Sequence, residues 1–441
     1  MTTPAVGPAA RRPAPRGTSG PSAPSTRRVK RSPATSVALA ERAGGPDLAR
    51  GLALLGIAMA NTIGWLHGTE WTVLLKQADA TVADRIVDVI ASFTIDNRGF
   101  PLFAMLFGYG IGILHRRSQA RGERARTFLA RTARRHLALL LLGLTHGILL
   151  FSGDILTSYA IIGMLCALLV TARKRWLPPL AAILTTPLLA FWGWADGTIG
   201  LWGMDGYDDA SAATYLEGLE IRAWDMLYVV GSSLASDLGL LGPMVIGALA
   251  ARIHLFEQVR PNRDILVPLT AVGIAVGLVG AVPLTAVLVI DPHHDWLYNE
   301  IALGILGVIH QFSGVVGALG AAAAAALIAD HVRRSNGPPG TPGLGVPARA
   351  VYAVEALGAM ALTAYVAQSA VFMALFPPYT LDLGARVGSA GAAVIVLVSW
   401  LAMVAIAVLL RRAGRRGPLE VVLRKLGGST SPRSAGKAGP S

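Results

Sequence analysis

A histidine and an aspartate on either side of a short polar segment are the pair best suited to acid–base chemistry. His146 lies near the end of one apolar segment, and Asp154 begins the next after a sharp turn. A histidine that gains a carboxylate partner can act as a general base near neutral pH. Eight residues correspond to about 12 Å along a helix. We therefore expect no direct contact between the two side chains, and a substrate or water chain that bridges them.

Asp154 also has a purely structural interpretation. A carboxylate at the start of a helix accepts hydrogen bonds from the free backbone N–H groups there and is favoured by the helix dipole. Ser152 and Gly153 would then simply form the turn between the two helices. The sequence leaves both interpretations open, a catalytic pair with His146 or a helix cap.

Six further polar side chains fall inside apolar segments, where such groups are costly and often mark a pathway or a reactive site. They are Asn61, Asp237, His310, Gln311, Tyr365 and Gln368. The amides Asn61, Gln311 and Gln368 could instead join helices by hydrogen bonds, and His310 could be a satisfied core histidine. Asp237 falls near the middle of its segment, so it needs a cation, a proton or water nearby.

Ten apolar segments must position these residues. They cover residues 51–66, 99–114, 136–152, 154–171, 177–195, 226–251, 265–290, 301–329, 351–376 and 387–410. The gaps, which are the stretches of chain before, between and after these segments, alternate between basic and acidic. The N-terminal stretch is counted as the first gap. Odd-numbered gaps hold 34 of the 39 Lys and Arg residues, and even-numbered gaps hold 17 of the 26 Asp and Glu residues. Because short basic loops stay in the cytoplasm, the pattern predicts an all-α, polytopic integral membrane protein with about ten transmembrane helices and both termini cytoplasmic.

The overall composition agrees with insertion into a bilayer. Of the 441 residues, 53% are hydrophobic and 15% are charged, whereas soluble chains carry about 25% charged residues. The net charge of +13 is concentrated at the ends of the apolar segments, where it would face anionic lipid headgroups. We expect a multi-pass protein of the cell membrane whose partners are the lipid bilayer and the headgroups of its cytoplasmic face, and no nucleic acid.

Three regions follow from the distribution of apolar residues. Residues 1–45 form a basic tail rich in Pro, Ala and Ser, which we expect to be disordered and cytoplasmic because it has little apolar surface to bury. Residues 46–426 form the membrane domain, and residues 427–441 a second disordered tail. Within the membrane domain, residues 82–94 place charged and apolar side chains on opposite helical faces. They predict an amphipathic helix at the outer surface.

The sequence contains no motif for a metal site or a bound cofactor. It lacks a Walker loop, an HExxH helix and a GxSxG nucleophile elbow. The glycines of residues 108–112 lie inside an apolar segment without a preceding strand, so they favour close contact between helices.

Five motifs in order make the sequence resemble the bacterial family called domain of unknown function 418, the YeiB-like membrane proteins. They lie at residues 47–57 with Asn61, 100–110, 146–156, 360–368 and 417–424. The third contains His146-Gly147 and the run Gly-Asp-Ile-Leu. Three residues depart from the pattern of the family, because Ala359 and Ala364 stand where it has Arg and Asn, and Val421 stands where it has Trp.

The opening Arg-Gly and Asn pattern is also similar to that of transmembrane acyltransferases. These enzymes pass an acyl group from a cytoplasmic thioester to a sugar or similar acceptor across the membrane. The resemblance implies an acyl-CoA-type donor, with His146 as general base, Asp154 orienting it or the acceptor, and Asn61 in the same polar site. Arg50 and the basic segment 115–135 would hold the anionic part of the donor.

The sequence leaves two other functions open. A small-molecule transporter or flippase would use Asp237 and His310 as proton or cation sites near the middle of the membrane. A membrane scaffold would carry out no chemistry. Gln311, Tyr365 and Gln368 are candidates for substrate binding in either functional case.

The arrangement of these side chains in space would discriminate between the three functions. Clustering of Asn61, His146, Asp154 and His310 around one cavity would favour the enzyme. A cavity centred on Asp237 would favour transport, and dispersed polar groups with satisfied hydrogen bonds would favour the scaffold.

Overall fold

The computed structural model describes residues 44–336 and 345–427. The tails expected at 1–45 and 427–441 fall almost wholly outside the described residues. The described part of the chain folds into helices in the following order: α1 (Gly44–Thr62), α2 (Val82–Thr94), α3 (Gly99–Ala120), α4 (Ala125–Leu149), α5 (Leu156–Thr171), α6 (Leu177–Thr185), α7 (Ala190–Thr198), α8 (Tyr215–Ser232), α9 (Leu241–Arg252), α10 (Arg263–Ile290), α11 (Glu300–Asn336), α12 (Val346–Gly358), α13 (Ala361–Leu375), α14 (Ser389–Arg412) and α15 (Pro418–Leu426).

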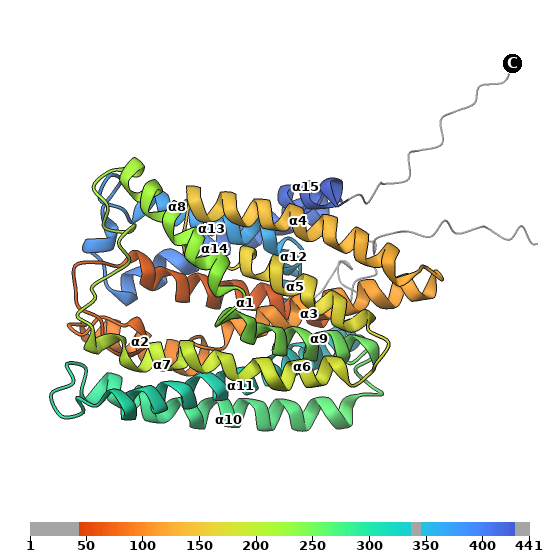
Figure 1. The fold of residues 1–441 in the computed structure, drawn as a ribbon, viewed down its shortest axis with the longest axis horizontal. Helices are drawn as coiled ribbons and strands as arrows, with labels where there is room; N and C mark the ends of the chain where they lie inside the picture. The colour runs from red at the N-terminus through yellow and green to blue at the C-terminus, as the bar shows by residue number, and fades with distance from the viewer. Residues whose placement is uncertain (1–43, 337–344, 428–441) are drawn as a thin grey trace, which may run out of the picture.

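Most of the long helices run along one common axis, with α1 at the centre (Figure 1). Helix α1 packs against α3, α11, α12 and α14. It buries a face of small and branched apolar residues that includes Leu48, Leu54 and Ile57. Helices α10 and α11 pack along each other, as do α3 and α9. The all-α fold class is therefore confirmed for the described residues, whose sole sheet-like feature is one bridge between Trp71 and Gln77.

Each of the ten predicted segments corresponds to a helix or to a run of consecutive helices. Among the described residues, five helices are long and apolar enough to cross a membrane, or up to seven if each of two bent pairs counts as one span. The other three segments correspond to α3, α4 and α5. Helix α5 has only 16 residues. Helices α3 and α4 contain histidine, arginine and several glycines that lower their hydropathy.

The surface of the bundle is apolar where a soluble protein would be polar. Large hydrophobic side chains are exposed along the long helices, for example Val279 and Val282 of α10 and Val398 and Leu401 of α14. Contiguous exposed apolar surface of this kind marks contact with a partner or a membrane. The long apolar helices and their exposed side chains together indicate membrane association.

Helix α2 coincides with the predicted amphipathic helix, but its charged face is buried and its apolar face is exposed. Thr81 caps it in a capping box with Asp84. Asp84 and Asp88 are buried, whereas Ile86 and Ile90 are more than half exposed. The helix packs against α10 and α14, so its charged face points into the protein and its apolar face points outwards.

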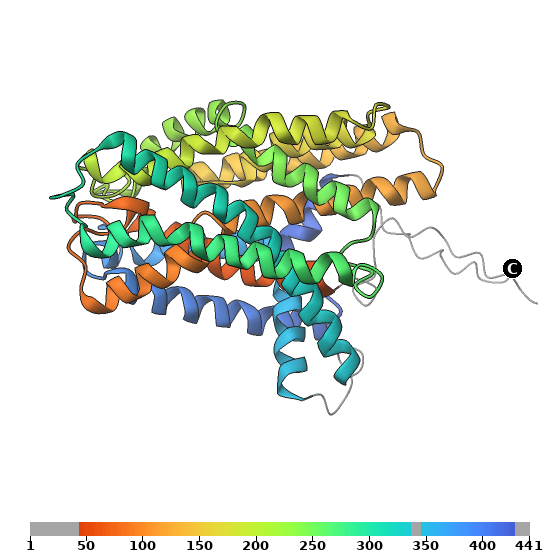
Figure 2. The ribbon, with the colours of Figure 1, turned by 90° about the horizontal axis from the view of Figure 1, so that it is seen from below.

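Two of the predicted spans are broken rather than straight. Helices α8 and α9 are bent by 57°, and α12 and α13 by 82°, which leaves α12 standing across the main axis (Figure 2). At the first break, the Ser233 hydroxyl donates to the Val229 carbonyl, a back-bonding pattern that bends helices. At the second, a Cβ on Gly358 would lie 1.8 Å from the Asp47 carbonyl oxygen, so only glycine permits this close approach to α1.

Candidate functional site

The turn between α4 and α5 brings His146 and Asp154 into direct contact. Helix α4 ends at Leu149 and α5 begins at Leu156. The His146 Nδ1 atom lies 2.9 Å from Asp154 Oδ1, and both side chains are buried. The expectation that the two side chains do not touch is therefore wrong. The estimate of 12 Å applies to a continuous helix, whereas here the chain reverses and carries Asp154 back towards the last turn of α4.

Asp154 also has the capping role that its position suggests. Its second oxygen, Oδ2, accepts a hydrogen bond from the Thr157 backbone N–H at 2.8 Å, in the first turn of α5. A Cβ on Gly143 would lie 2.6 Å from that nitrogen and 2.9 Å from Oδ2, so the glycine lets α4 and α5 approach closely at this point. One carboxylate thus serves as helix cap and as histidine partner together.

The other nitrogen of the imidazole contacts a serine that the sequence motifs did not single out. His146 Nε2 lies 2.9 Å from Ser369 Oγ on α13, and Ser369 is buried. An ionised Asp154 only accepts hydrogen bonds, so Nδ1–H donates to it and Nε2 accepts from the Ser369 hydroxyl. A hydroxyl, an imidazole and a carboxylate joined in this order have the arrangement that nucleophilic catalysis requires. A serine in an apolar helix is common, so only the fold could identify this one.

Of the other predicted residues, Tyr365 contacts the histidine directly. The Tyr365 ring packs on His146 with centroids 5.0 Å apart, and its hydroxyl accepts from the Ile155 backbone N–H at 3.4 Å. Asn61 forms a side-chain hydrogen bond with Tyr365. Gln368 donates to the Leu54 carbonyl of α1 at 3.4 Å, as expected of an amide that joins two helices.

Helix α13, which carries Ser369 and Tyr365, is held at its N-terminus by α15. Glu420 Oε1 accepts from the backbone N–H groups of Leu362 at 2.8 Å and of Thr363 at 3.2 Å. These N–H groups lack partners within their own helix, and a carboxylate is favoured at the positive end of the helix dipole. The Gly-Pro-Leu-Glu motif thus fixes one end of the helix that supplies the serine.

Arg50 lies away from this cluster. Its Nη1 donates to Asp47 at 2.7 Å, and its Nη2 donates to the Leu106 carbonyl of α3 at 3.0 Å. Asn61 is eleven residues further along the same helix, which corresponds to about 16 Å. These contacts tie the start of α1 to α3, and they occupy part of the guanidinium that was expected to hold the donor.

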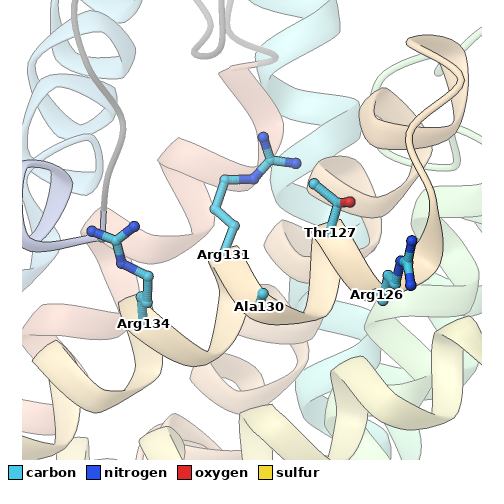
Figure 3. Close-up of a pocket in the computed structure, with 6 residues that line it drawn as sticks. Arg126, Thr127, Ala130, Arg131 and Arg134 are labelled. Carbon is cyan, nitrogen blue, oxygen red and sulfur yellow. The ribbon is translucent and has the colours of Figure 1, made fainter.

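The basic segment 115–135 contributes to a cavity on the surface of the bundle. The cavity has a volume of about 580 Å³, and Arg126, Arg131 and Arg134 line it. The three arginines project from one side of the first turns of α4 (Figure 3). Gly427, which follows α15, lines the cavity as well.

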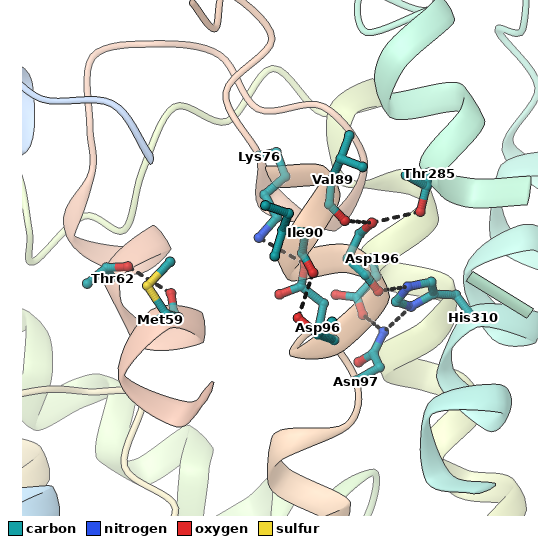
Figure 4. A network of polar contacts seen from close by, with 12 residues as sticks. Met59, Thr62, Lys76, Val89, Ile90, Asp96, Asn97, Asp196, Thr285 and His310 are labelled. Carbon is teal, nitrogen blue, oxygen red and sulfur yellow. Dashed lines mark hydrogen bonds and ion pairs between the residues drawn. The ribbon is translucent and has the colours of Figure 1, made fainter. Parts of the chain in front are cut away.

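His310 belongs to a separate polar network near the start of α3 (Figure 4). Asn97 Nδ2 lies 2.6 Å from Asp196 Oδ2 and 3.1 Å from His310 Nδ1. Because the amide nitrogen donates both bonds, Nδ1 accepts, and the opposite nitrogen donates to the Ser92 carbonyl at 3.0 Å. His310 is thus a neutral, satisfied histidine and lies in a different cluster from His146.

Asp237 and Gln311 do not join the His146 cluster either. Asp237 begins a short turn at the break between α8 and α9. Its carboxylate accepts from Ser158 at 2.7 Å, Trp192 at 3.0 Å and Ser232 at 3.2 Å. Gln311 is buried, and neither polar atom of its side chain has a hydrogen-bond partner within the described part of the chain.

The predicted residues are therefore divided among several places, and His310 does not join Asn61, His146 and Asp154 as was expected of the enzyme. Asn61, His146, Asp154 and Tyr365 are linked by contacts where α1, α4, α5 and α13 meet, and Gln368 joins α13 to α1. Sequence reasoning missed Ser369 in that cluster, and it also missed the Asn97 and Asp196 that surround His310. Across the described residues, no group of three His, Cys, Asp or Glu side chains has an arrangement suited to a metal ion.

Comparison with known proteins agrees with the motifs. Residues 250–428 match the family model described as protein of unknown function (DUF418). The chain is 27% identical to the uncharacterized protein YeiB of Escherichia coli (strain K12) over 86% of this chain and 94% of that protein. It is 26% identical to the uncharacterized protein YxaH of Bacillus subtilis (strain 168), over 45% of this chain and 47% of that protein.

A third relative is an uncharacterized 39.9 kDa protein encoded in the amylase 3′ region of Bacillus acidopullulyticus. It is 36% identical over 29% of this chain and 34% of that protein. The matches to the two Bacillus proteins thus span less than half of their length. The family model and the long match to YeiB confirm the resemblance to the DUF418, YeiB-like proteins that the motifs predicted.

Proposed function

We propose that this protein is an acyltransferase of the cell membrane. The observation that carries the proposal is the buried chain Ser369–His146–Asp154, with both hydrogen bonds at 2.9 Å. This chain provides a nucleophile, a general base and a carboxylate that fixes the tautomer of the base. A thioester such as an acyl-coenzyme A is the donor, and an extracytoplasmic or lipid-linked hydroxyl is the acceptor.

The proposed reaction has two steps, acylation of Ser369 and transfer of the acyl group to the acceptor. In the first, Ser369 Oγ loses its proton to His146 Nε2 and attacks the thioester carbonyl carbon. The carbon–sulfur bond then breaks, and the thiol leaves with the proton from His146. In the second step, the acceptor hydroxyl gives its proton to His146 and attacks the acyl-serine, and the Ser369 oxygen takes the proton back. Tyr365 positions the imidazole by packing on it, and Asn61 supports Tyr365 through a hydrogen bond.

The proposal includes a topology of ten crossings with both termini in the cytoplasm. Its support is the match between ten predicted segments and consecutive helices, and the concentration of Lys and Arg at alternate ends. In this topology the arginines at the start of α4 lie at the cytoplasmic face, and His146 lies in the outer half of the membrane. The lipid bilayer, with its anionic headgroups, is the proposed partner.

Covalent labelling tests the proposed reaction. The full chain in lipid nanodiscs is incubated with acetyl- or palmitoyl-coenzyme A, and the mass of the intact protein is measured. We expect one acyl group on the wild-type chain and none on Ser369→Ala. His146→Gln should slow labelling by roughly 10²–10⁴-fold, the usual contribution of a general base.

A second buried serine provides the matched control. Ser158 on α5 hydrogen-bonds to Ser233 and Asp237, outside the His146 cluster, so Ser158→Ala should label like the wild type. Equal labelling of the Ser369→Ala and wild-type chains, or no label on the wild type with either donor, would contradict the proposed reaction.

Transport of a small molecule or proton is the second candidate function. It is favoured by the position of Asp196 and His310, which share the Asn97 amide as a common partner. Asp196 lies on α7. The same helix carries Trp192, which lies one turn before Asp196 and donates a hydrogen bond to Asp237. Ionisable groups placed in succession inside apolar helices are a typical feature of proton pathways.

A further inference from the structure

The cavity on the first turns of α4 has more positive than negative charge around it. Arg131 forms an ion pair with Glu123. Among the described residues, Arg126 and Arg134 have no acidic partner, and both are exposed. The Arg121 and Arg131 guanidinium groups hold the pKa of the Glu123 carboxyl well below its usual range. That single anion is therefore already engaged, and two positive charges at the cavity remain uncompensated.

The size and chemistry of the cavity suit an anion that carries several oxygen atoms. Its volume of about 580 Å³ falls within the roughly 300–1,000 Å³ of small-molecule sites. A guanidinium presents planar donors that match the oxygens of a phosphate, and it stays charged at all relevant pH values. Arg126 and Arg134 are eight residues apart on one helix, about 12 Å, so they can hold two phosphates of one ligand or one headgroup between them.

The same helix connects the cavity to the Ser369–His146–Asp154 chain. Arg134 and His146 are twelve residues apart on α4, which corresponds to about 18 Å along the helix axis. A ligand with a phosphate-bearing head in the cavity and an acyl group on a long arm or chain could extend along α4 towards Ser369. The extension of the acyl group towards Ser369 rests on the proposed acyl transfer, whereas phosphate binding in the cavity does not.

We propose that Arg126, Arg131 and Arg134 form a binding site for the phosphate groups of an acyl-bearing ligand. Two sources supply that chemistry, a soluble nucleotide-linked thioester and an anionic phospholipid. In either case the site holds the charged head at the membrane surface, and α4 directs the acyl group towards the interior.

The test uses a double substitution that leaves the Arg131–Glu123 pair intact. Arg126→Gln/Arg134→Gln is compared with Arg173→Gln/Arg175→Gln, which removes the same charge from the exposed turn between α5 and α6 at the same end of the bundle (Figure 1). In phosphatidylcholine nanodiscs, binding of coenzyme A is measured by calorimetry. In parallel, phosphatidylglycerol retained by each protein in mixed nanodiscs is measured by native mass spectrometry. Gel filtration of each variant verifies that it is folded.

We expect the first variant to weaken binding of one of the two probes by about tenfold or more, because it removes charge-assisted hydrogen bonds. The second variant should bind like the wild type. A loss confined to coenzyme A identifies the soluble source, and a loss confined to phosphatidylglycerol identifies the lipid. Equal binding of both probes by all three proteins, or binding of neither by the wild type, would overturn the proposal. The binding measurement requires no turnover. Its outcome therefore does not depend on whether Ser369 is labelled.

Discussion

At the scale of single residues, Asp154 combines two hydrogen-bonding roles that a single substitution can separate. Its Oδ2 caps α5 through the Thr157 N–H, and its Oδ1 accepts from His146. Asparagine is as good a cap as aspartate, but it has only one oxygen. If that oxygen keeps the cap, the amide N–H₂ faces His146 and favours the tautomer whose Nε2 carries a proton, which can no longer accept from Ser369.

We therefore expect Asp154→Asn to give folded protein whose acyl labelling at Ser369 is slower by roughly 10²–10⁴-fold. Labelling rate and thermal unfolding are measured on the same nanodisc preparation. The control is Thr214→Ala, which removes only a cap, since Thr214 Oγ1 accepts from the Glu217 N–H of α8. That variant should lose about 1 kcal/mol of stability and label normally. Normal labelling by Asp154→Asn would leave Asp154 as a cap alone.

The sequence predicted the two partners of this cluster that stand close together in the chain, and it missed the third. His146 and Asp154 flank one turn, so their pairing depends only on local geometry. Ser369 is 223 residues from His146, and no local pattern distinguishes it from the other serines of apolar helices. Even the local contact was misjudged, because a helical rise was applied across a chain reversal.

At the scale of the helices, the existence and order of the elements were predictable, whereas the breaks were not. Hydropathy locates apolar segments, but Ser233 and Gly358 act through contacts with particular backbone atoms. Helix α2 illustrates the same limit. Its periodicity predicted two faces, and only the packing against α10 and α14 showed that the charged face points inwards.

The break between α8 and α9 gives Asp237 a role that can be tested apart from the proposed acyl-transfer site. Its carboxylate accepts from three donors, so Asp237→Asn places an N–H₂ against at least one donor. We expect a loss of about 1–3 kcal/mol of stability, the cost of one unsatisfied buried group. Ser369 should still be labelled, because none of the three donors contacts His146. Thermal unfolding and labelling in nanodiscs provide both measurements.

Ser236→Ala is the control for this variant, since Ser236 lies in the same break and precedes Asp237. It should leave both stability and labelling unchanged. A stable Asp237→Asn protein that no longer forms the acyl-serine would place Asp237 in the reaction, and one that labels normally but loses transport of a proton would favour the second candidate function.

At the scale of the whole molecule, the charge pattern predicts which ends of the bundle face the cytoplasm. Cys166 is the only cysteine in the sequence, and it is fully buried, so single introduced thiols can be labelled selectively. In intact cells, an impermeant maleimide should label Asp208→Cys and should reach Arg124→Cys only after lysis. Both positions are exposed. The wild-type chain is the control for background, and labelling of both positions in intact cells, or the reverse order, would contradict the ten-span topology.

The contact between Glu420 and α13 also determines when the Ser369–His146–Asp154 chain can form during synthesis. Helices α4 and α5, which supply His146 and Asp154, are made in the first half of the chain. Helix α13, which supplies Ser369, receives its N-terminal partner from α15, the last helix of the described chain. A ribosome must therefore have translated the sequence through α15 before the serine is held in place, and a nascent chain that stops before α15 has its other helices without this support.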